Sequence, residues 1–162
     1  MVDYIGNWVK NRDAKKQILA KTLDKLKKSK NILEVAEDIN IDITSKIDCL
    51  DCANCCKSIP PIINKTDIQR ISKFLKLKPK DFEEQYIITD EDMDMIFKNS
   101  PCVFLDDDNK CFIYEVRPKS CREYPHTNNY EFVKNIKLHK NNLYYCPIVF
   151  NCIESLKLKF QI

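Results

Sequence analysis

Apolar residues recur with helical spacing over the first part of the chain. Between Arg12 and Lys28 they return every three to four residues, and lysines occupy half of the other positions. The apolar positions are Ala14, Ile18, Leu19, Leu23 and Leu26. A second apolar set runs from Ile32 to Ile39. The pattern predicts an N-terminal pair of helices, the second folding back on the first.

Beyond residue 48 the predicted elements are shorter. One helix is predicted over residues 68–77, with Asn64, Thr66 and Asp67 as candidate N-caps, and another over 79–86, starting at Pro79. The other predicted elements are strands over Met95–Phe97 and Val103–Leu105, a turn over Asp106–Asn109 and a closing helix over Asn151–Phe160. The fold class that follows is mainly α with short irregular strands.

The cysteines divide the sequence into two parts. The chain has 162 residues, and its nine cysteines all follow residue 48. We therefore predict an N-terminal helical extension over residues 1–47 and a small cysteine-rich domain over 48–162. This length suffices for one domain with an appended element.

The glycine content excludes two large classes of nucleotide-binding protein. The chain contains one glycine, Gly6. Dinucleotide-binding folds and P-loop NTPases need several glycines in one short loop, because only glycine lets backbone N–H groups close on a phosphate. A Rossmann-type methyltransferase is disfavoured for the same reason.

The cysteine content is several times ordinary usage. The first residues hold Asp3 and Asn7 and lack the pattern of a secretory signal, and no apolar run approaches the roughly 20 residues of a membrane span. We therefore expect a cytoplasmic, reducing location. Cysteine clusters in that setting indicate metal or redox chemistry rather than structural disulfides.

The densest cysteine cluster is Cys49-Leu-Asp-Cys52-Ala-Asn-Cys55-Cys56. Two residues between cysteines let one turn direct both sulfurs to a single centre. Three cysteines at C-x₂-C-x₂-C spacing are typical of bacterial ferredoxins, whereas zinc sites more often pair two separate C-x₂-C knuckles. The spacing therefore favours an iron–sulfur cluster over zinc. Cys56 is expected to serve a second centre, because adjacent side chains point apart.

The other cysteines are widely spaced, as expected for ligands that tie loops together through a metal. They are Cys102, Cys111, Cys121, Cys146 and Cys152. Eight ligands would fill two four-coordinate sites, and we expect the spare cysteine to be Cys152, a buried apolar thiol in the closing helix. Two tetrathiolate sites would lower the formal net charge from +3 to about −1. The mild basicity is therefore weak evidence for a nucleic-acid partner.

Together these motifs resemble the CxxCxxCC family, also called YkgJ-like, whose members are zinc- or iron-chelating domains. The resemblance rests on CLDCANCC at residues 49–56, PCVFLDDDNKCFIYEVRPKSCREYP at 101–125, and Cys146. It implies a metal-binding set of Cys49, Cys52, Cys55, Cys56, Cys102, Cys111, Cys121 and Cys146. Family members often have glycine where this chain has Ala53-Asn54, and we expect Asn54 to supply the left-handed backbone there.

Two arginines, Arg117 and Arg122, lie in the second motif near Cys121. A guanidinium can donate to cluster sulfurs, neutralise a site of charge −2, or grip a carboxylate. We interpret both as cofactor-binding residues that surround the ligands. The alternative is an ion pair with Glu115 or Glu123.

Catalytic residues are not apparent in the sequence. No HExxH motif or Ser/His/Asp arrangement occurs. His126 is a minor candidate ligand because it lies close to Cys121. His139 lies in a basic, asparagine-rich stretch and is expected to be exposed.

Three function classes remain open. The first is a metal-cluster protein. We prefer a [4Fe–4S]-type site, or two such sites, in a redox role. The alternative is a structural zinc site that presents a surface to a protein or peptide partner. The second follows from resemblance, because flagellin lysine-N-methylases carry a similar cysteine domain, which implies S-adenosylmethionine-dependent protein methylation. The third, a nucleic-acid module, is disfavoured because the basic first helix lacks interleaved arginine and aromatic residues.

Overall fold

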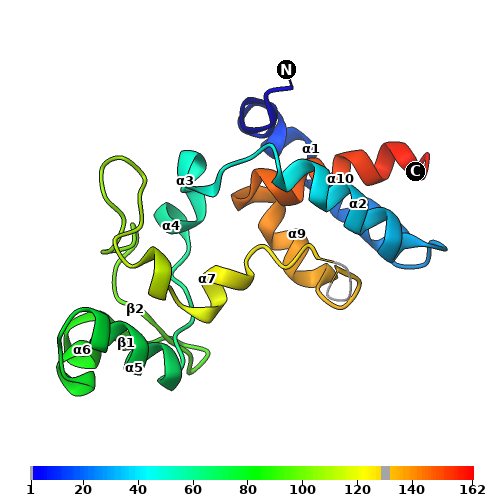
Figure 1. Ribbon diagram of the computed structural model, residues 1–162. Coiled ribbons are helices and arrows are strands. Elements are labelled where there is room, and N and C mark those ends of the chain that lie inside the picture. Colours follow the sequence, from blue (N-terminus) through cyan, green and yellow to red (C-terminus); the bar gives the residue numbers. More distant parts are fainter. Residues whose placement is uncertain (1, 129–131) are drawn as a thin grey trace. The chain divides into compact units, whose positions relative to one another are not determined.

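The N-terminal pair of helices is present in the computed structural model, which describes residues 2–128 and 132–162 (Figure 1). α1 spans Tyr4–Leu26 and α2 spans Ile32–Thr44. α1 begins earlier than predicted because Asp3 caps it, its Oδ1 accepting the Gly6 N–H at 2.8 Å. Trp8, in the added segment, is buried.

The chain divides into two compact units. The terminal unit comprises the residues up to Cys52 and those from Pro125 to Ile162, and the central unit comprises Ala53–Tyr124. The division predicted from the cysteine distribution, into residues 1–47 and 48–162, stays a prediction.

The terminal unit consists of helices. Besides α1 and α2 it contains α3 (Cys49–Cys52), α9 (Ile136–Tyr145) and α10 (Pro147–Lys159). α10 packs against α1, α2 and α9, and α1 also packs against α9. The main contact partner of α2 is therefore α10. The prediction that α2 folds back on α1 stays a prediction. The predicted closing helix is confirmed as α10, which starts at Pro147 and so includes one more turn.

Large apolar side chains fill the core of the terminal unit. The fully buried ones include Leu19, Leu23, Leu26, Ile43, Phe132, Leu143, Val149, Phe150, Ile153 and Leu156. Polar side chains add links between helices: Asn151 Nδ2 donates to the Tyr4 carbonyl at 3.0 Å, and Lys15 Nζ lies 2.5 Å from Glu154 Oε1. The core explains why the helical periodicity of residues 12–28 was readable from sequence.

His139 is buried in this unit, so the prediction that it is exposed is wrong. Its ring stacks on Phe132 with centroids 5.0 Å apart and an interplanar angle of 25°. The basic residues around it in the sequence lie on other faces of α9, because a helix turns neighbouring residues by about 100°.

The central unit combines short helices with one hairpin. Its elements are α4 (Asn54–Ser58), α5 (Lys65–Phe74), α6 (Pro79–Tyr86), β1 (Ile87–Thr89), β2 (Met95–Phe97), the 3₁₀ helix η1 (Tyr114–Val116) and α7 (Lys119–Glu123). Both predicted helices are confirmed. α5 starts with a capping box between Asn64 and Asp67, and α6 starts with Pro79.

The hairpin joins β1 to β2 in antiparallel register, with Ile87 opposite Phe97 and Thr89 opposite Met95. The predicted strand over Met95–Phe97 is confirmed. The strand predicted over Val103–Leu105 is wrong, because that segment turns, with the Leu105 N–H donating to the Cys102 carbonyl at 3.0 Å.

Aromatic rings and isoleucines form the core of the central unit. The buried residues are Ile63, Ile68, Ile71, Phe82, Phe97, Phe104 and Ile113. The Phe104 ring lies 5.2 Å from that of Phe97 and 5.1 Å from that of Tyr86. Phe104 is thus held by ring contacts rather than by strand pairing. Cys102 and Cys111 pack at the edge of this core.

The two units together confirm a mainly α fold with short strands and N-terminal helices. Within the described residues, none of the helices has the length and apolar character needed to cross a bilayer.

Candidate metal centre

The nine cysteines all lie within the described residues and are all present as thiols. Each unit contains some of them. The terminal unit holds Cys49, Cys52, Cys146 and Cys152, and the central unit holds Cys55, Cys56, Cys102, Cys111 and Cys121. The tight run CLDCANCC therefore spans the boundary at which the two units are divided.

In the central unit, α4 carries Cys55 and Cys56. Their sulfur atoms lie 4.0 Å apart. The Cys102 N–H donates to the Cys56 carbonyl at 2.8 Å, which joins two cysteines that are distant in the sequence. Ala53, just before α4, has the left-handed angles φ 45° and ψ 15°. The expectation that Asn54 takes this conformation is wrong, since Asn54 is already the first residue of α4.

Cys111 lies at the end of an acidic turn. The predicted turn over Asp106–Asn109 is confirmed: the Asn109 N–H donates to the Asp106 carbonyl at 3.1 Å, and Asn109 has a φ of 63°. Leu105 and Cys111 then form an isolated antiparallel bridge. The loop thus brings Cys111 back to the segment that starts at Cys102.

Cys121 is carried by α7. One contact that fixes this helix is the Ser120 hydroxyl, which donates to the Ile62 carbonyl at 2.8 Å. Ile62 precedes α5 and forms a bridge with Ile96 of β2. The helix that bears Cys121 is therefore tied to the core of the central unit.

The electrostatics of the central unit distinguish Cys56 from the other thiols. A hydrogen bond from Cys55 lowers the pKa of Cys56 to about 7. Burial raises the pKa of Cys102 to about 11 and that of Cys121 to about 12, and charge on Cys56 raises both further. Burial also raises the pKa of Cys111, and charge on Cys56 is a smaller cause in the same direction. These four thiols are close enough to repel one another as thiolates, and a cation among them would relieve that repulsion.

In the terminal unit, Cys146 is the most buried of the three predicted ligands. It is the N-cap residue of α10, whereas Cys49 is exposed and Cys52 half-buried on α3. Burial raises the pKa of Cys146 to about 12, the Val149 and Ile148 N–H groups oppose the rise, and charges on Cys49 and Cys52 add to it. Cys49, Cys52 and Cys146 thus interact electrostatically.

Cys152 is buried in α10, with 2% of its surface exposed. Burial raises the pKa of this thiol, and charge on Cys146 is a smaller cause in the same direction. An apolar, neutral thiol inside a helix fits the predicted role of the spare cysteine. Its assignment as the spare stays a prediction.

The thiols of each unit interact with one another, but their side chains do not yet form a metal-coordinating geometry. Within residues 2–128 and 132–162, no three His, Cys, Asp or Glu side chains stand in an arrangement that would by itself hold a metal ion. Binding would therefore require the cysteine side chains of a unit to draw together. The donors fit such an ion chemically, because thiolates are the ligands that zinc and iron–sulfur clusters take.

Arg117 and Arg122 donate to main-chain carbonyls. Arg117 Nη1 lies 2.7 Å from the Tyr114 carbonyl, with the guanidinium 3.8 Å from the centre of the Tyr114 ring. Arg122 Nη1 lies 2.6 Å from the Arg117 carbonyl, and Glu123 pairs with Lys119 at 3.6 Å. The positive charge of Arg117 lowers the pKa of Cys111 against the dominant effect of burial.

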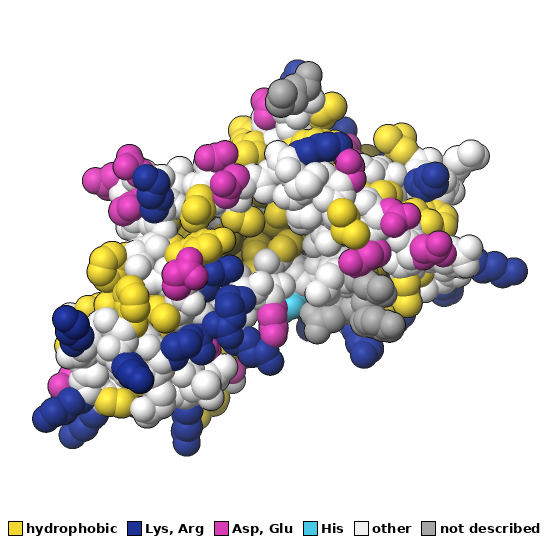
Figure 2. Space-filling model, viewed as in Figure 1, with side chains coloured by type: hydrophobic (Ala, Val, Ile, Leu, Met, Phe, Trp, Pro, Cys, Tyr) yellow, Lys and Arg dark blue, Asp and Glu magenta, His cyan; other side chains and the backbone are white. Residues whose placement is uncertain are grey.

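Lys and Arg side chains gather over α7 on the face shown in Figure 2. The sequence around this helix supplies Arg117, Lys119 and Arg122. Positive charge beside Cys121 would offset the negative charge of a thiolate centre.

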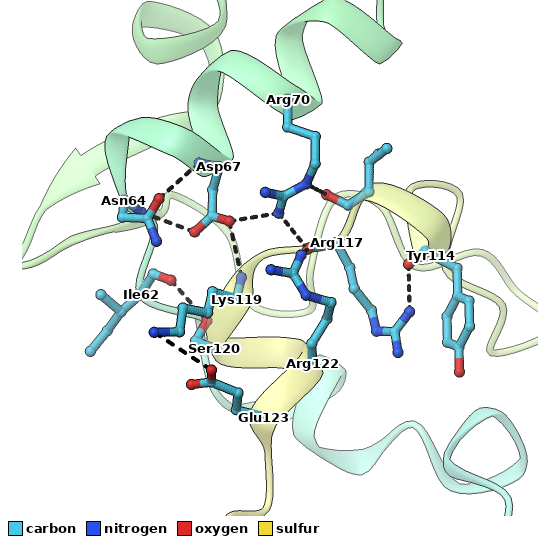
Figure 3. Close-up of polar contacts among 11 residues, drawn as sticks. Ile62, Asn64, Asp67, Arg70, Tyr114, Arg117, Lys119, Ser120, Arg122 and Glu123 are labelled. Carbon is cyan, nitrogen blue, oxygen red and sulfur yellow. Dashed lines mark hydrogen bonds and ion pairs between the residues drawn. The ribbon is translucent and has the colours of Figure 1, made fainter.

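Two residues that sequence reasoning did not link to the cysteines lie in this region. Arg70 of α5 donates to the Arg117 carbonyl just before α7, and Asp67 of α5 accepts the N–H of Lys119, the first residue of α7 (Figure 3). Asp67 was readable only as a helix cap, because its other bond reaches a residue 52 positions away. The i,i+3 spacing of Asp67 and Arg70 is a local pattern typical of a helical ion pair, but it reveals neither the burial of the carboxylate nor its bond to Lys119.

Comparison with protein families matches residues 48–147 to the CxxCxxCC model, described as a "putative zinc- or iron-chelating domain". No solved structure matches the chain. The matched range includes eight cysteines and excludes Cys152.

Proposed function

The chain belongs to the CxxCxxCC family, and from this membership we propose that it is an iron–sulfur protein with a redox role, its clusters held by cysteine thiolates. Zinc or iron chelation is the coarser function that the family name carries. The finer proposal, a [4Fe–4S]-type cluster, adds the identity of the metal centre.

The observation that carries the proposal is the sulfur-only donor group of the central unit. It comprises Cys56, Cys102, Cys111 and Cys121: charge on Cys56 raises the pKa of the other three, and charges on Cys102 and Cys111 also raise that of Cys121. Soft thiolate sets select zinc, copper(I) or iron–sulfur clusters over metals that prefer oxygen ligands. The C-x₂-C-x₂-C run of Cys49, Cys52 and Cys55 lies outside this group, and its spacing favours iron–sulfur over zinc for the chain.

A second ligand group is proposed in the terminal unit, from Cys49, Cys52 and Cys146. The two groups account for seven of the eight cysteines inside the matched range, and the eighth, Cys55, lies beside Cys56. The deep burial of Cys146 excludes water from that sulfur, and the N-terminus of α10 gives it a favourable dipole.

An iron–sulfur cluster supplies one-electron transfer when bound. The side chains around it tune that chemistry. Arg117 brings positive charge to Cys111, and Lys119 and Arg122 lie on α7 with Cys121. Positive charge near a thiolate centre favours its more negative, reduced form.

One observation favours zinc as a second candidate. Apart from η1 and α7, residues 98–124 form turns and loops, and they carry three of the cysteines. A closed tetrathiolate zinc site would stabilise such a segment by ligation alone. In that case the function is structural, and the central unit would present a surface to a protein partner.

Anaerobic purification followed by iron, zinc and acid-labile sulfide analysis separates the two candidates. The proposal expects iron and sulfide in similar amounts and a broad brown absorption that dithionite partly bleaches. Colourless protein with stoichiometric zinc from both aerobic and anaerobic preparations would exclude the iron–sulfur proposal and support the structural zinc site.

A further inference from the structure

Asp67 is a buried carboxylate whose two oxygens accept bonds from three parts of the central unit. Its side chain is 1% exposed. Oδ2 accepts the Asn64 N–H at 3.2 Å, which completes the capping box of α5. Oδ1 accepts Arg70 Nη2 at 2.6 Å and the Lys119 N–H at 3.0 Å (Figure 3). One of these bonds is local and needed for the helix, but the bond to Lys119 joins α5 to α7.

Arg70 extends this link. Its Nε donates to the Val116 carbonyl at 3.3 Å, and Nη2 also donates to the Arg117 carbonyl at 2.8 Å. The Arg117 carbonyl accepts a second guanidinium, that of Arg122, at 2.6 Å. Pro118, the next residue, has no N–H to satisfy. Hydrogen bonds from Asp67 and Arg70 of α5 thus fix the main chain of residues 116–119.

This held segment lies between two proposed ligands. η1 follows Cys111, whose carbonyl accepts the Tyr114 N–H at 3.1 Å, and α7 carries Cys121. Lys119 is the first residue of α7, so its N–H is one of those that a helix cannot satisfy internally. Asp67 supplies the missing acceptor from another helix.

From these contacts we infer that Asp67 and Arg70 are positioning residues for the thiol centre of the central unit: by holding residues 116–119 they fix the direction in which α7 presents Cys121 relative to Cys111. The inference rests on the proposed function, because it requires these thiols to bind a metal. A buried ion pair contributes little net stability but restricts geometry, which is the property that a metal site needs.

A backbone variant isolates the key bond. Lys119→Pro removes the N–H that Asp67 accepts, and proline fits at the first position of a helix. Pro118 already has the extended ψ of 152° that a following proline requires. Lys119→Ala is the matched control, since it removes the same exposed side chain and keeps the N–H. Both variants retain the thiols of the terminal unit, so their difference reports on the central unit.

The test is cobalt(II) titration of the reduced, metal-free full chain, with a competing chelator to obtain affinity and the cobalt d–d spectrum to report ligand geometry. Lys119→Pro is expected to bind the central-unit cobalt about 10-fold more weakly than Lys119→Ala and to shift the d–d bands. Both variants lose the charge of Lys119, so the difference between them reports on the N–H alone. Equal affinity and an equal spectrum for the two variants would overturn the inference.

A side-chain variant gives the same decision if Lys119→Pro does not fold. Arg70→Lys keeps the charge beside Asp67 but cannot span both the Val116 and Arg117 carbonyls, so the same weakening and spectral shift are expected. Wild-type cobalt binding in this variant would also overturn the inference. If the wild type binds no cobalt and is purified without iron, sulfide or zinc, the proposed function fails, and the inference with it; if only the variant comparison fails, the proposed function stands.

Discussion

The two units of the chain are stabilised in different ways. In the terminal unit, long helices bury leucine, isoleucine and phenylalanine side chains along their contact faces, as Leu23 of α1 and Phe150 of α10 do. In the central unit, a small aromatic core supports α5, α6 and the hairpin, and the cysteine-bearing residues 98–124 contain only η1 and α7. The terminal unit has a conventional core, whereas the cysteine-bearing segment depends on turns, carbonyl contacts and thiols.

This difference indicates which part of the chain would depend on bound metal for its folding. Helix faces bury enough apolar surface to stabilise themselves by packing. Residues 98–124 contribute Phe104 and Ile113 to a buried core, and the turns between them depend on ligation or on buried polar contacts such as that of Asp67 with Lys119. The predictions that follow test this contrast.

Metal removal should have the largest effect and should act on one unit. Structural metal binding stabilises small thiolate sites by on the order of 10 kcal/mol. Chelation under reducing conditions is therefore expected to abolish amide exchange protection in residues 98–124 while α1 and α10 stay protected. Hydrogen exchange read by mass spectrometry checks this. Uniform loss of protection across both units, or no loss in either, would contradict the contrast.

A core substitution in the terminal unit should destabilise that unit and not the central one. Leu156→Ala removes a side chain that is 0% exposed and should lower the free energy of unfolding by about 2–5 kcal/mol. Leu158→Ala on the same helix is the matched control, since Leu158 is 78% exposed, and should change it by less than about 0.5 kcal/mol. Denaturant unfolding followed by circular dichroism measures both.

Metal binding to the central unit should be unaltered in the two leucine variants. The thiols of that unit belong to a different core from Leu156. A loss of central-unit metal in Leu156→Ala alone would show that the two units fold as one, and the contrast between them would fail.

The same contrast explains what the sequence could predict. Helices with local caps were readable: Asn64 marks α5 and Pro79 marks α6, because capping depends on a few neighbouring residues. The triplet Val103–Leu105 has the composition of a strand, but contacts of Phe104 with Tyr86 and Phe97 decide its conformation. β1 was missed because Ile87 follows α6 without a turn residue to mark the change.

The sequence could predict which cysteines are candidate ligands, but not which of them lie near one another. Spacing and resemblance supplied the eight cysteines, since thiol clusters are rare and specific. Which cysteines lie near one another depends on contacts such as that of Cys102 with the Cys56 carbonyl, made across the sequence. The roles of Asp67 and Arg70 depend on such contacts as well. His139 was misjudged because burial is set by helix packing rather than by neighbours in sequence.

Two adjacent cysteines allow the grouping itself to be tested. Charge on Cys56 acts on Cys102, Cys111 and Cys121, and the sulfur of Cys55 lies 4.0 Å from that of Cys56. In a chain with Cys49→Ser and Cys52→Ser, Cys56→Ser should weaken zinc binding by about 100-fold, the upper end of the loss seen when a ligand's partner is removed. Cys55→Ser should bind as the parent does. Competition with a chromophoric chelator measures both.

The contrary outcome is informative. Equal weakening by Cys55→Ser and Cys56→Ser would make Cys55 a fifth participant in the central-unit centre. Weakening by Cys55→Ser alone would show that Cys56 is not a ligand there, and the proposed four-thiol group would be wrong.

The smallest effect is expected at Cys152, the one cysteine outside the family match. Its thiol is buried and neutral, because burial raises its pKa, so it serves the apolar core of the terminal unit. Cys152→Ala should lower the free energy of unfolding by about 1 kcal/mol and leave metal content unchanged. Cys152→Ser should cost more, because it introduces a buried hydroxyl into an apolar site. Metal analysis of the purified variants decides the matter: a loss as large as that of Cys146→Ser would make Cys152 a ligand and leave another cysteine as the spare.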